Sequence, residues 1–154
     1  MGKTGILLVG HGSKKEYNKD LITKTAGLIA ERHPEYVVKC GFMEFNEPSI
    51  TQALDLFRDE DINSIAVVPL FLARGVHIDE DIPGLLKLAP GQKKGKFDLR
   101  GREIPLVYAD PIGPNPLLAD LMAENARQAL SFIWFFMQIL ILDSIHGGTV
   151  LHEA

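Results

Sequence analysis

Apolar residues gather along the chain in four short runs. The runs are residues 5–10, 37–43, 64–70 and 104–109. Nearly continuous apolar runs of this length are typical of strands with both faces covered, as in a parallel sheet. We therefore predict four buried strands that run parallel to one another.

The segments between these runs carry apolar residues at helical spacing. After the first run, one helical face collects Leu21, Ile22, Thr25, Leu28 and Ile29. Ser13 and Glu16 match a capping box, which predicts that this helix begins next to Ser13. Further helices are predicted after Pro48, after Asp79 and after Asn115. The alternation predicts an α/β fold, a single-domain doubly wound sheet of about four parallel strands flanked by helices.

Two segments stand outside this alternation. Residues 89–103 are rich in glycine and lysine and are predicted to form an exposed excursion. Residues 132–142 are apolar all round, but a membrane span needs about 20 such residues. We therefore assign residues 1–131 to the main domain. We expect the apolar tail, residues 132–154, to be buried in that domain or in an oligomer contact.

Composition limits the kinds of partner. The 154 residues, 46% hydrophobic and 23% charged, suit one soluble globular domain. The formal net charge of −4 provides no basic field, so we expect neither nucleic acid nor a membrane as partner. Cys40 is the only cysteine, which excludes an internal disulfide. With no signal-peptide pattern at the N-terminus, we expect a cytoplasmic protein.

Two histidines follow predicted strands. His11 comes directly after residues 5–10, and His77 follows the third run after a short loop. Ligands of open α/β sheets bind at the carboxyl ends of the strands, so two imidazoles there could share one divalent metal ion. Neutral imidazole suits nickel, cobalt, zinc and iron(II). Two protein ligands would leave coordination positions open, as a metal that is handed on requires.

The turn around His11 also allows other interpretations. Its histidine could simply hydrogen-bond a carbonyl group within the turn. A glycine-rich turn before a helix can also hold a phosphate on its free N–H groups. A phosphohistidine nucleophile is disfavoured, because histidine phosphatases carry an arginine directly before the histidine, where this chain has Gly10. A phosphoryl-binding enzyme that uses residues 10–13 therefore stays open as an alternative.

Glu44 and Glu47 lie on the loop predicted after the second strand. A carboxylate that lines the same crevice could accept or relay protons. The alternative is a solvated loop with a carboxylate near a helix start, which the helix dipole favours. We treat Glu47 as a candidate site residue, and Glu44 and Ser13 as possible secondary ones.

Five motifs, in order, resemble one known family. They occupy residues 8–13, 41–48, 68–77, 81–83 and 110–113. Together they resemble the short archaeal sirohydrochlorin chelatases, namely the small CbiX-type cobaltochelatases and the CfbA-type nickel chelatases. The resemblance covers roughly residues 5–130, and the apolar tail does not match it.

The resemblance implies an enzyme, a lyase that forms nitrogen–metal bonds. Such an enzyme inserts Co²⁺ or Ni²⁺ into sirohydrochlorin without ATP, in cobalamin or methanogen nickel-tetrapyrrole biosynthesis. The resemblance also implies a homodimer, in which two short chains resemble the two halves of a long class II chelatase. We expect no tightly bound cofactor, since the metal is a substrate. A metal or tetrapyrrole carrier without turnover remains the alternative from another class.

The resemblance also implies roles for individual residues. His11 and His77 would bind the metal, and His11 would accept pyrrole protons. The expected tetrapyrrole contacts are Glu47, Leu72, Ala73, Arg74, Gly75, Val76 and His77. Gly75 would let a flat ring approach closely, and Arg74 could pair with carboxylates on the ring.

Overall fold

The computed structural model describes residues 2–146, and for residues 139, 140 and 143–146 it describes the backbone alone. The chain forms two compact units, Met1–Gly113 and Pro114–Ala154. The first unit holds the sheet and both histidines of interest, and each unit is described by itself.

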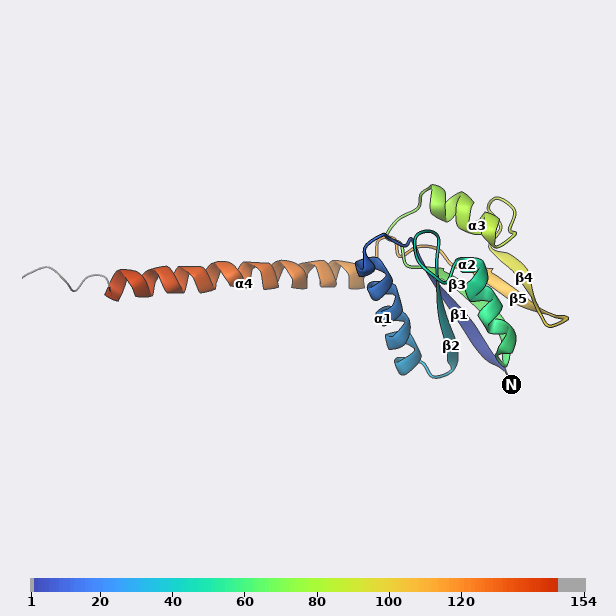
Figure 1. The fold of residues 1–154 in the computed structure, drawn as a ribbon. Helices are drawn as coiled ribbons and strands as arrows, with labels where there is room; N and C mark the ends of the chain where they lie inside the picture. Colours follow the sequence, from blue (N-terminus) through green and yellow to red (C-terminus); the bar gives the residue numbers. More distant parts are fainter. Residues whose placement is uncertain (1, 147–154) are drawn as a thin grey trace, which may run out of the picture. The chain divides into compact units, whose positions relative to one another are not determined.

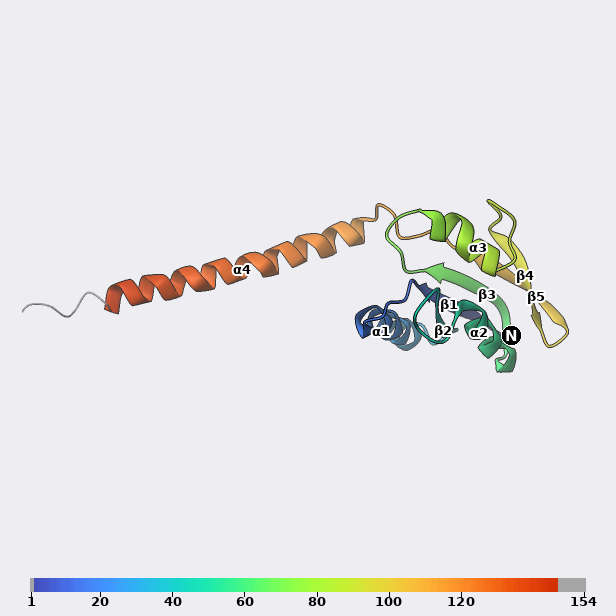
Figure 2. The same ribbon diagram turned by 45° about the horizontal axis from the view of Figure 1, so that its top comes forward.

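The first unit is built on a five-stranded sheet in the order β2-β1-β3-β5-β4 (Figure 1). The strands are β1 (Lys3–Gly10), β2 (Tyr36–Phe42), β3 (Ile62–Pro69), β4 (Lys94–Leu99) and β5 (Arg102–Tyr108). Strands β2, β1, β3 and β5 run parallel to one another. Figure 2 shows β4 and β5 on the side of β3 away from β1. The predicted α/β fold with four parallel strands is confirmed.

Strand β4 corrects the expectation for residues 89–103. Residues 94–99 pair antiparallel with residues 102–107 of β5, so most of the segment is a hairpin that belongs to the sheet. Gly95, Phe97 and Leu99 are at least partly buried, whereas the lysines and the aspartate between them are exposed. This alternation is that of an edge strand with one covered face. The polar residues that suggested a loop form its other face.

Helices lie on both faces of the sheet. Helix α1 (Glu16–Arg32) packs Ile22 and Ala26 against Leu8 and Phe42. The larger core cluster is on the other face, with the elements α2 (Ile50–Asp55), the 3₁₀ turn η1 (Leu56–Asp59), the π-helical turn η2 (His77–Asp81) and α3 (Ile82–Leu85). Burial of apolar residues on both faces explains the continuous apolar strands.

Helix α1 begins later than the capping box predicts. It starts at Glu16, and Lys15 at its N-cap makes no side-chain capping bond. The N–H of Ser13 donates to Oδ1 of Asn46 at 2.8 Å, so Ser13 is bound to the loop after β2. The capping-box prediction at Ser13 was therefore wrong: its hydroxyl accepts a hydrogen bond from the N–H of Lys15 at 3.2 Å, before the helix begins, and its N–H is bound to the neighbouring loop. A capping box does form at Ser49, where α2 begins.

The described part of the second unit is one helix, α4 (Pro116–His146). Its predicted start is confirmed, because Oδ1 of Asn115 accepts a hydrogen bond from the N–H of Leu117 at 2.9 Å. Pro116 occupies the first helical position, where its missing N–H costs nothing.

Helix α4 runs through residue 131, where we expected the main domain to end. Those large apolar side chains after this point that the structure describes are exposed in the single chain, Trp134 by 70%. Among the residues described, no helix combines the length and the apolar character needed to cross a bilayer. The last part of the expected tail, residues 147–154, lies outside the described residues, and the division at residue 131 stays a prediction.

Candidate functional site

The loops that follow four neighbouring strands are hydrogen-bonded in two pairs. After β1 and β2, the N–H groups of Met43 and Glu44 donate to the carbonyl groups of Gly10 and His11, at 3.1 and 3.0 Å. After β3 and β5, the N–H groups of residues 112 and 113 donate to the carbonyl groups of residues 71 and 72, both at 2.9 Å. Each pair of loops at the carboxyl edge of the sheet is thus tied together, at the place where such sheets bind ligands.

Gly12 allows the first two loops to approach closely. Its φ angle is +91°, and a Cβ atom on this residue would lie 1.8 Å from the carbonyl oxygen of Glu44. Its N–H donates to Oδ1 of Asn18 in α1 at 2.9 Å. No side chain fits this position, so the turn that carries His11 depends on glycine.

The imidazoles of His11 and His77 are in contact. Their Nε2 atoms are 3.2 Å apart, and the ring planes meet at 74° with centroids 4.8 Å apart. Both side chains are partly exposed to solvent. The fold therefore brings together, on one chain, the two histidines that the sequence pattern singled out.

The remaining ring nitrogens have acceptors as partners. Nδ1 of His11 lies 3.0 Å from the carbonyl oxygen of Gly12, and Nδ1 of His77 lies 2.7 Å from Oδ2 of Asp81. Carbonyl and carboxylate oxygens only accept, so we assign the proton of each neutral ring to Nδ1. Each Nε2 atom then carries a lone pair, and the two lone pairs face one another.

Two facing lone pairs at this distance suit a shared cation. With metal–nitrogen bonds of about 2.0–2.1 Å, a separation of 3.2 Å corresponds to a nitrogen–metal–nitrogen angle of about 100°. This value lies between the cis octahedral and the tetrahedral angles. Within residues 2–146, as far as their side chains are described, no three His, Cys, Asp or Glu residues form a potential metal-binding group. A cation held here would keep at least half of its coordination positions open.

Arg74 already has two carboxylate partners. Its guanidinium lies 2.8 Å from Asp79 and 2.6 Å from Asp110, so it ties the loop before His77 to η2 and to the end of β5. Lys93 also bonds Asp110 at 3.0 Å, and this hydrogen bond holds the pKa of the Asp110 carboxyl below its ordinary value. The expected pairing of Arg74 with a substrate carboxylate would require an exchange of partners.

Large apolar side chains on the same loops are exposed. Leu72, Val76 and Phe45 are 62%, 61% and 59% exposed. Around Gly75, a Cβ atom would meet nothing within 4 Å, so the space next to this loop is open. Ala73 is exposed as well. Exposed apolar surface of this kind marks a binding site for an apolar partner or ligand.

Phe45 is a candidate that sequence reasoning missed. Its φ angle is +61°, which is rare for a bulky residue and marks a backbone held by its surroundings. Nζ of Lys14 lies 5.7 Å from the centroid of its ring. The available signal was an aromatic residue between Glu44 and Asn46 in an otherwise polar loop.

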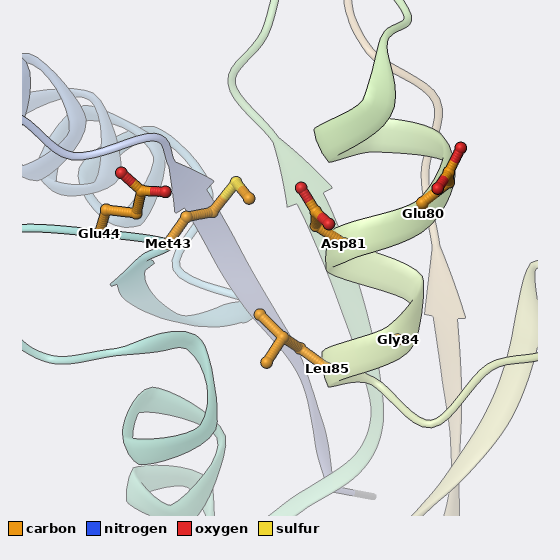
Figure 3. Close-up of a pocket in the computed structure, with 6 residues that line it drawn as sticks. All are labelled: Met43, Glu44, Glu80, Asp81, Gly84 and Leu85. Carbon is orange, nitrogen blue, oxygen red and sulfur yellow. The ribbon is translucent and has the colours of Figure 1, made fainter.

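Glu44 lines an open pocket of about 500 Å³ that also involves Asp81 (Figure 3). The other lining residues are Met43, Glu80, Gly84 and Leu85. In Figure 3 the carboxylate of Asp81 points toward Met43, whereas that of Glu80 points away from it. Glu47 is exposed on the same loop as Glu44. The catalytic and binding roles expected of Glu44 and Glu47 stay predictions.

Asp81 is the second residue that sequence reasoning missed. It follows His77 by four residues, and this spacing places two side chains on one face of a helix. The spacing was visible in the sequence, but its meaning required that His77 itself begin the helical segment. The sequence had suggested a start after Asp79.

Comparison with known proteins identifies the family. The CbiX family model matches residues 5–129, most of the chain. This chain belongs to the CbiX family. The match ends before the apolar tail, and it includes both histidines, Asp81 and both candidate glutamates.

Individual relatives of this CbiX-family chain agree with the predicted resemblance. The sirohydrochlorin cobaltochelatase of Methanococcoides burtonii is 47% identical over 128 residues, which cover 83% of this chain and 98% of that protein. The one of Methanosarcina acetivorans is 44% identical with the same coverage. The sirohydrochlorin chelatase SirB of Bacillus subtilis, solved in complex with cobalt, matches with a TM-score of 0.69 and 25% identity. That match covers 82% of this chain and 50% of the SirB chain.

Proposed function

We propose that this chain is a sirohydrochlorin chelatase that inserts Co²⁺ into the tetrapyrrole without ATP. The observation that carries the proposal is the contact between His11 and His77, whose Nε2 lone pairs face one another at 3.2 Å. It is supported by near-complete coverage of a cobaltochelatase at 47% identity. The proposed reaction is part of cobalamin biosynthesis, in the cytoplasm.

Metal insertion exchanges two pyrrole protons for one divalent ion, so the site must hold a metal and accept protons. In our proposal His77 and His11 bind the hydrated ion through Nε2. As the tetrapyrrole nitrogens replace water and imidazole on the metal, His11 releases the metal and takes one pyrrole proton on Nε2. The second proton passes to water or to a carboxylate, for which Glu44 and Glu47 are the candidates. Binding by only two imidazoles lets the ion leave the protein.

The ring itself would lie against the exposed apolar residues of the loops. Leu72, Val76 and Phe45 offer apolar contact, and the open space beside Gly75 allows a flat ring to approach. Arg74 would exchange Asp110 for a carboxylate of the ring. A planar substrate of this size needs a larger contact surface than the loops of one chain provide.

We propose that a second copy of the chain supplies the missing contact surface in a symmetric homodimer. The chain covers 50% of SirB, so two copies would match its length. Two-fold dimers are also the commonest soluble oligomers. Light scattering on the full chain and on a chain ending at Ala129 tests this: we expect a dimer in both, and a full-length monomer would refute it. A dimer lost on truncation would assign the contact to the apolar tail.

The choice of metal is a finer part of the proposal. Imidazole binds both Co²⁺ and Ni²⁺, and affinity generally rises from cobalt to nickel. We propose cobalt as the physiological metal because the two relatives named above are cobaltochelatases. Parallel insertion assays with the two ions test this, and faster insertion of Ni²⁺ at equal free concentration would assign the chain to nickel.

The decisive experiment follows the absorption spectrum of sirohydrochlorin with Co²⁺, in the presence and absence of the protein. We expect the protein to accelerate the spectral change, and the His11→Ala variant to lose the acceleration. Tight binding of metal or ring with an unchanged rate would indicate a carrier. Strong protection of residues 10–13 by inorganic phosphate, equally in the wild type and in His77→Ala, would favour the phosphoryl-binding alternative.

A further inference from the structure

We infer that Asp81 is a positioning residue, which sets the tautomer of His77 so that its Nε2 lone pair points at His11. The inference rests on the proposed function, because it concerns the same metal site. It assigns a role to a side chain that would touch neither the metal nor the tetrapyrrole.

The contact between Asp81 and His77 is short and directional. Oδ2 of Asp81 lies 2.7 Å from Nδ1 of His77, a length typical of a hydrogen bond to a charged acceptor. A carboxylate can only accept this bond, so it selects the ring form with the proton on Nδ1. Nε2 then has no proton, and it faces Nε2 of His11 at 3.2 Å.

The other tautomer would block the site. With its proton on Nε2, His77 would donate a hydrogen bond to the Nε2 lone pair of His11, and both nitrogens would be occupied. A metal could then bind only after this bond broke and the proton moved. Histidines that bind metals almost always donate their other N–H to a carboxylate or carbonyl group, for this reason. Gly12 provides the carbonyl for His11.

The turn that carries both residues is fixed to the core. The N–H groups of Ile78 and Asp79 both donate to the carbonyl of Gly75 at 2.9 Å. The hydroxyl of Tyr108 donates to the carbonyl of Ile78 at 3.0 Å. Ile78 and Ile82, on either side of the Asp81 turn, are buried. The backbone is therefore held without help from the Asp81 side chain.

Asp81 can be removed without opening a cavity in the core. Its side chain is 46% exposed and borders the open pocket beside Met43 and Glu44. An Asp81→Ala variant should therefore fold. Glu80 offers a matched control, because it is an exposed acidic residue on the same turn whose carboxylate points away from Met43 in Figure 3.

The test reads the tautomer directly. Full-length protein with ¹⁵N-labelled histidine, free of metal, is studied by long-range ¹H–¹⁵N NMR at about pH 8, where ordinary imidazoles are neutral. The His77 signals are assigned by their loss in His77→Ala. We expect the Nδ1–H form in the wild type and in Glu80→Ala, and a shift to the Nε2–H form in Asp81→Ala. A wild-type His77 in the Nε2–H form, or an unchanged tautomer in Asp81→Ala, would overturn the inference.

Co²⁺ titration of the same variants connects the tautomer to the metal. We expect Asp81→Ala to weaken Co²⁺ binding by about 10- to 100-fold, and Glu80→Ala to stay within about twofold of the wild type. A changed tautomer with unchanged Co²⁺ affinity would refute the positioning role. Because the NMR readout needs neither metal nor sirohydrochlorin, it stands even if the protein inserts no metal, a result that would refute only the proposed function.

Discussion

The loops that carry the two histidines are held in different ways. The turn with His11 is clamped by backbone groups, since Gly12 packs against the carbonyl of Glu44 and the N–H of Glu44 bonds the carbonyl of His11. The loop before His77 has backbone bonds only at its start, from residues 112 and 113 to residues 71 and 72, and nearer to His77 it is held by side chains. Arg74 bonds Asp79 and Asp110 from an exposed position.

This difference predicts different tolerance to change. A buried glycine at a positive φ angle leaves no room for adjustment, so the position of His11 is fixed by the fold. Exposed ion pairs contribute about 0–1 kcal/mol each and weaken with salt. The His77 loop can therefore change conformation when a large substrate binds, while the position of His11 stays fixed.

The largest effects are expected from the histidines themselves. His11→Ala should abolish cobalt insertion, because it removes a metal ligand and the proposed proton acceptor, for which general-base losses of about 10²–10⁴-fold are usual. His77→Ala should weaken Co²⁺ binding and lower the rate severely. Co²⁺ titration and the spectral insertion assay measure both effects.

His33→Ala is the control for these variants, since His33 is exposed and pairs with Glu35. It should insert cobalt at the wild-type rate. Equal activity of His11→Ala and wild type would exclude a catalytic His11.

The next largest difference is expected between glycine substitutions in the two loops. Gly12→Ala should lower the free energy of unfolding by about 3 kcal/mol or more and abolish Co²⁺ binding, because the new Cβ would collide with the Glu44 carbonyl. Gly75→Ala should change stability by no more than about 1 kcal/mol, since its Cβ would enter open space. Urea unfolding compares the two. A Gly12→Ala variant as stable as Gly75→Ala would contradict the backbone clamp.

Arg74 tests whether the second loop exchanges partners. Arg74→Ala should raise the KM for sirohydrochlorin about 3- to 10-fold and leave kcat nearly unchanged, since one ion pair to the substrate is lost. Asp110→Asn should lower the KM, because it weakens the competing internal partner. If Asp110→Asn instead raises the KM as Arg74→Ala does, Arg74 serves only to tie the loop.

Tyr108 provides the smallest and most specific effect. Burial raises the pKa of its hydroxyl to about 12, with a smaller contribution from Asp79. Since the unfolded chain ionises near pH 10, the folded state retains the proton longer, and stability should fall as the pH rises from about 10 toward 12. Tyr108→Phe should lose about 1 kcal/mol at neutral pH with its bond to Ile78 and show a shallower alkaline decline. Urea unfolding measures the free energy of unfolding at each pH. An equally steep alkaline decline in the wild type and in Tyr108→Phe would contradict this assignment.

The sequence by itself determined the parallel core of the fold and the placement of the two histidines. Strands covered on both faces must be apolar throughout, and this pattern is visible without coordinates. Parallel strands also bring their carboxyl ends to one edge, so His11 after β1 and His77 after β3 could be expected to meet. Both inferences rest on properties that are local in the sequence.

Only the tertiary structure decided how the site is held. Strand β4 was hidden because an edge strand with one polar face resembles a loop in composition. The backbone N–H of Ser13 donates to Asn46, 33 residues away, and the partners of Arg74 include Asp110, 36 residues away. The tautomer of His77 depends on where helical geometry begins, since only a turn that starts at His77 brings Asp81 to its ring. Such choices are made by competition among distant groups for the same hydrogen bonds, and the sequence records those groups without recording which of them meet.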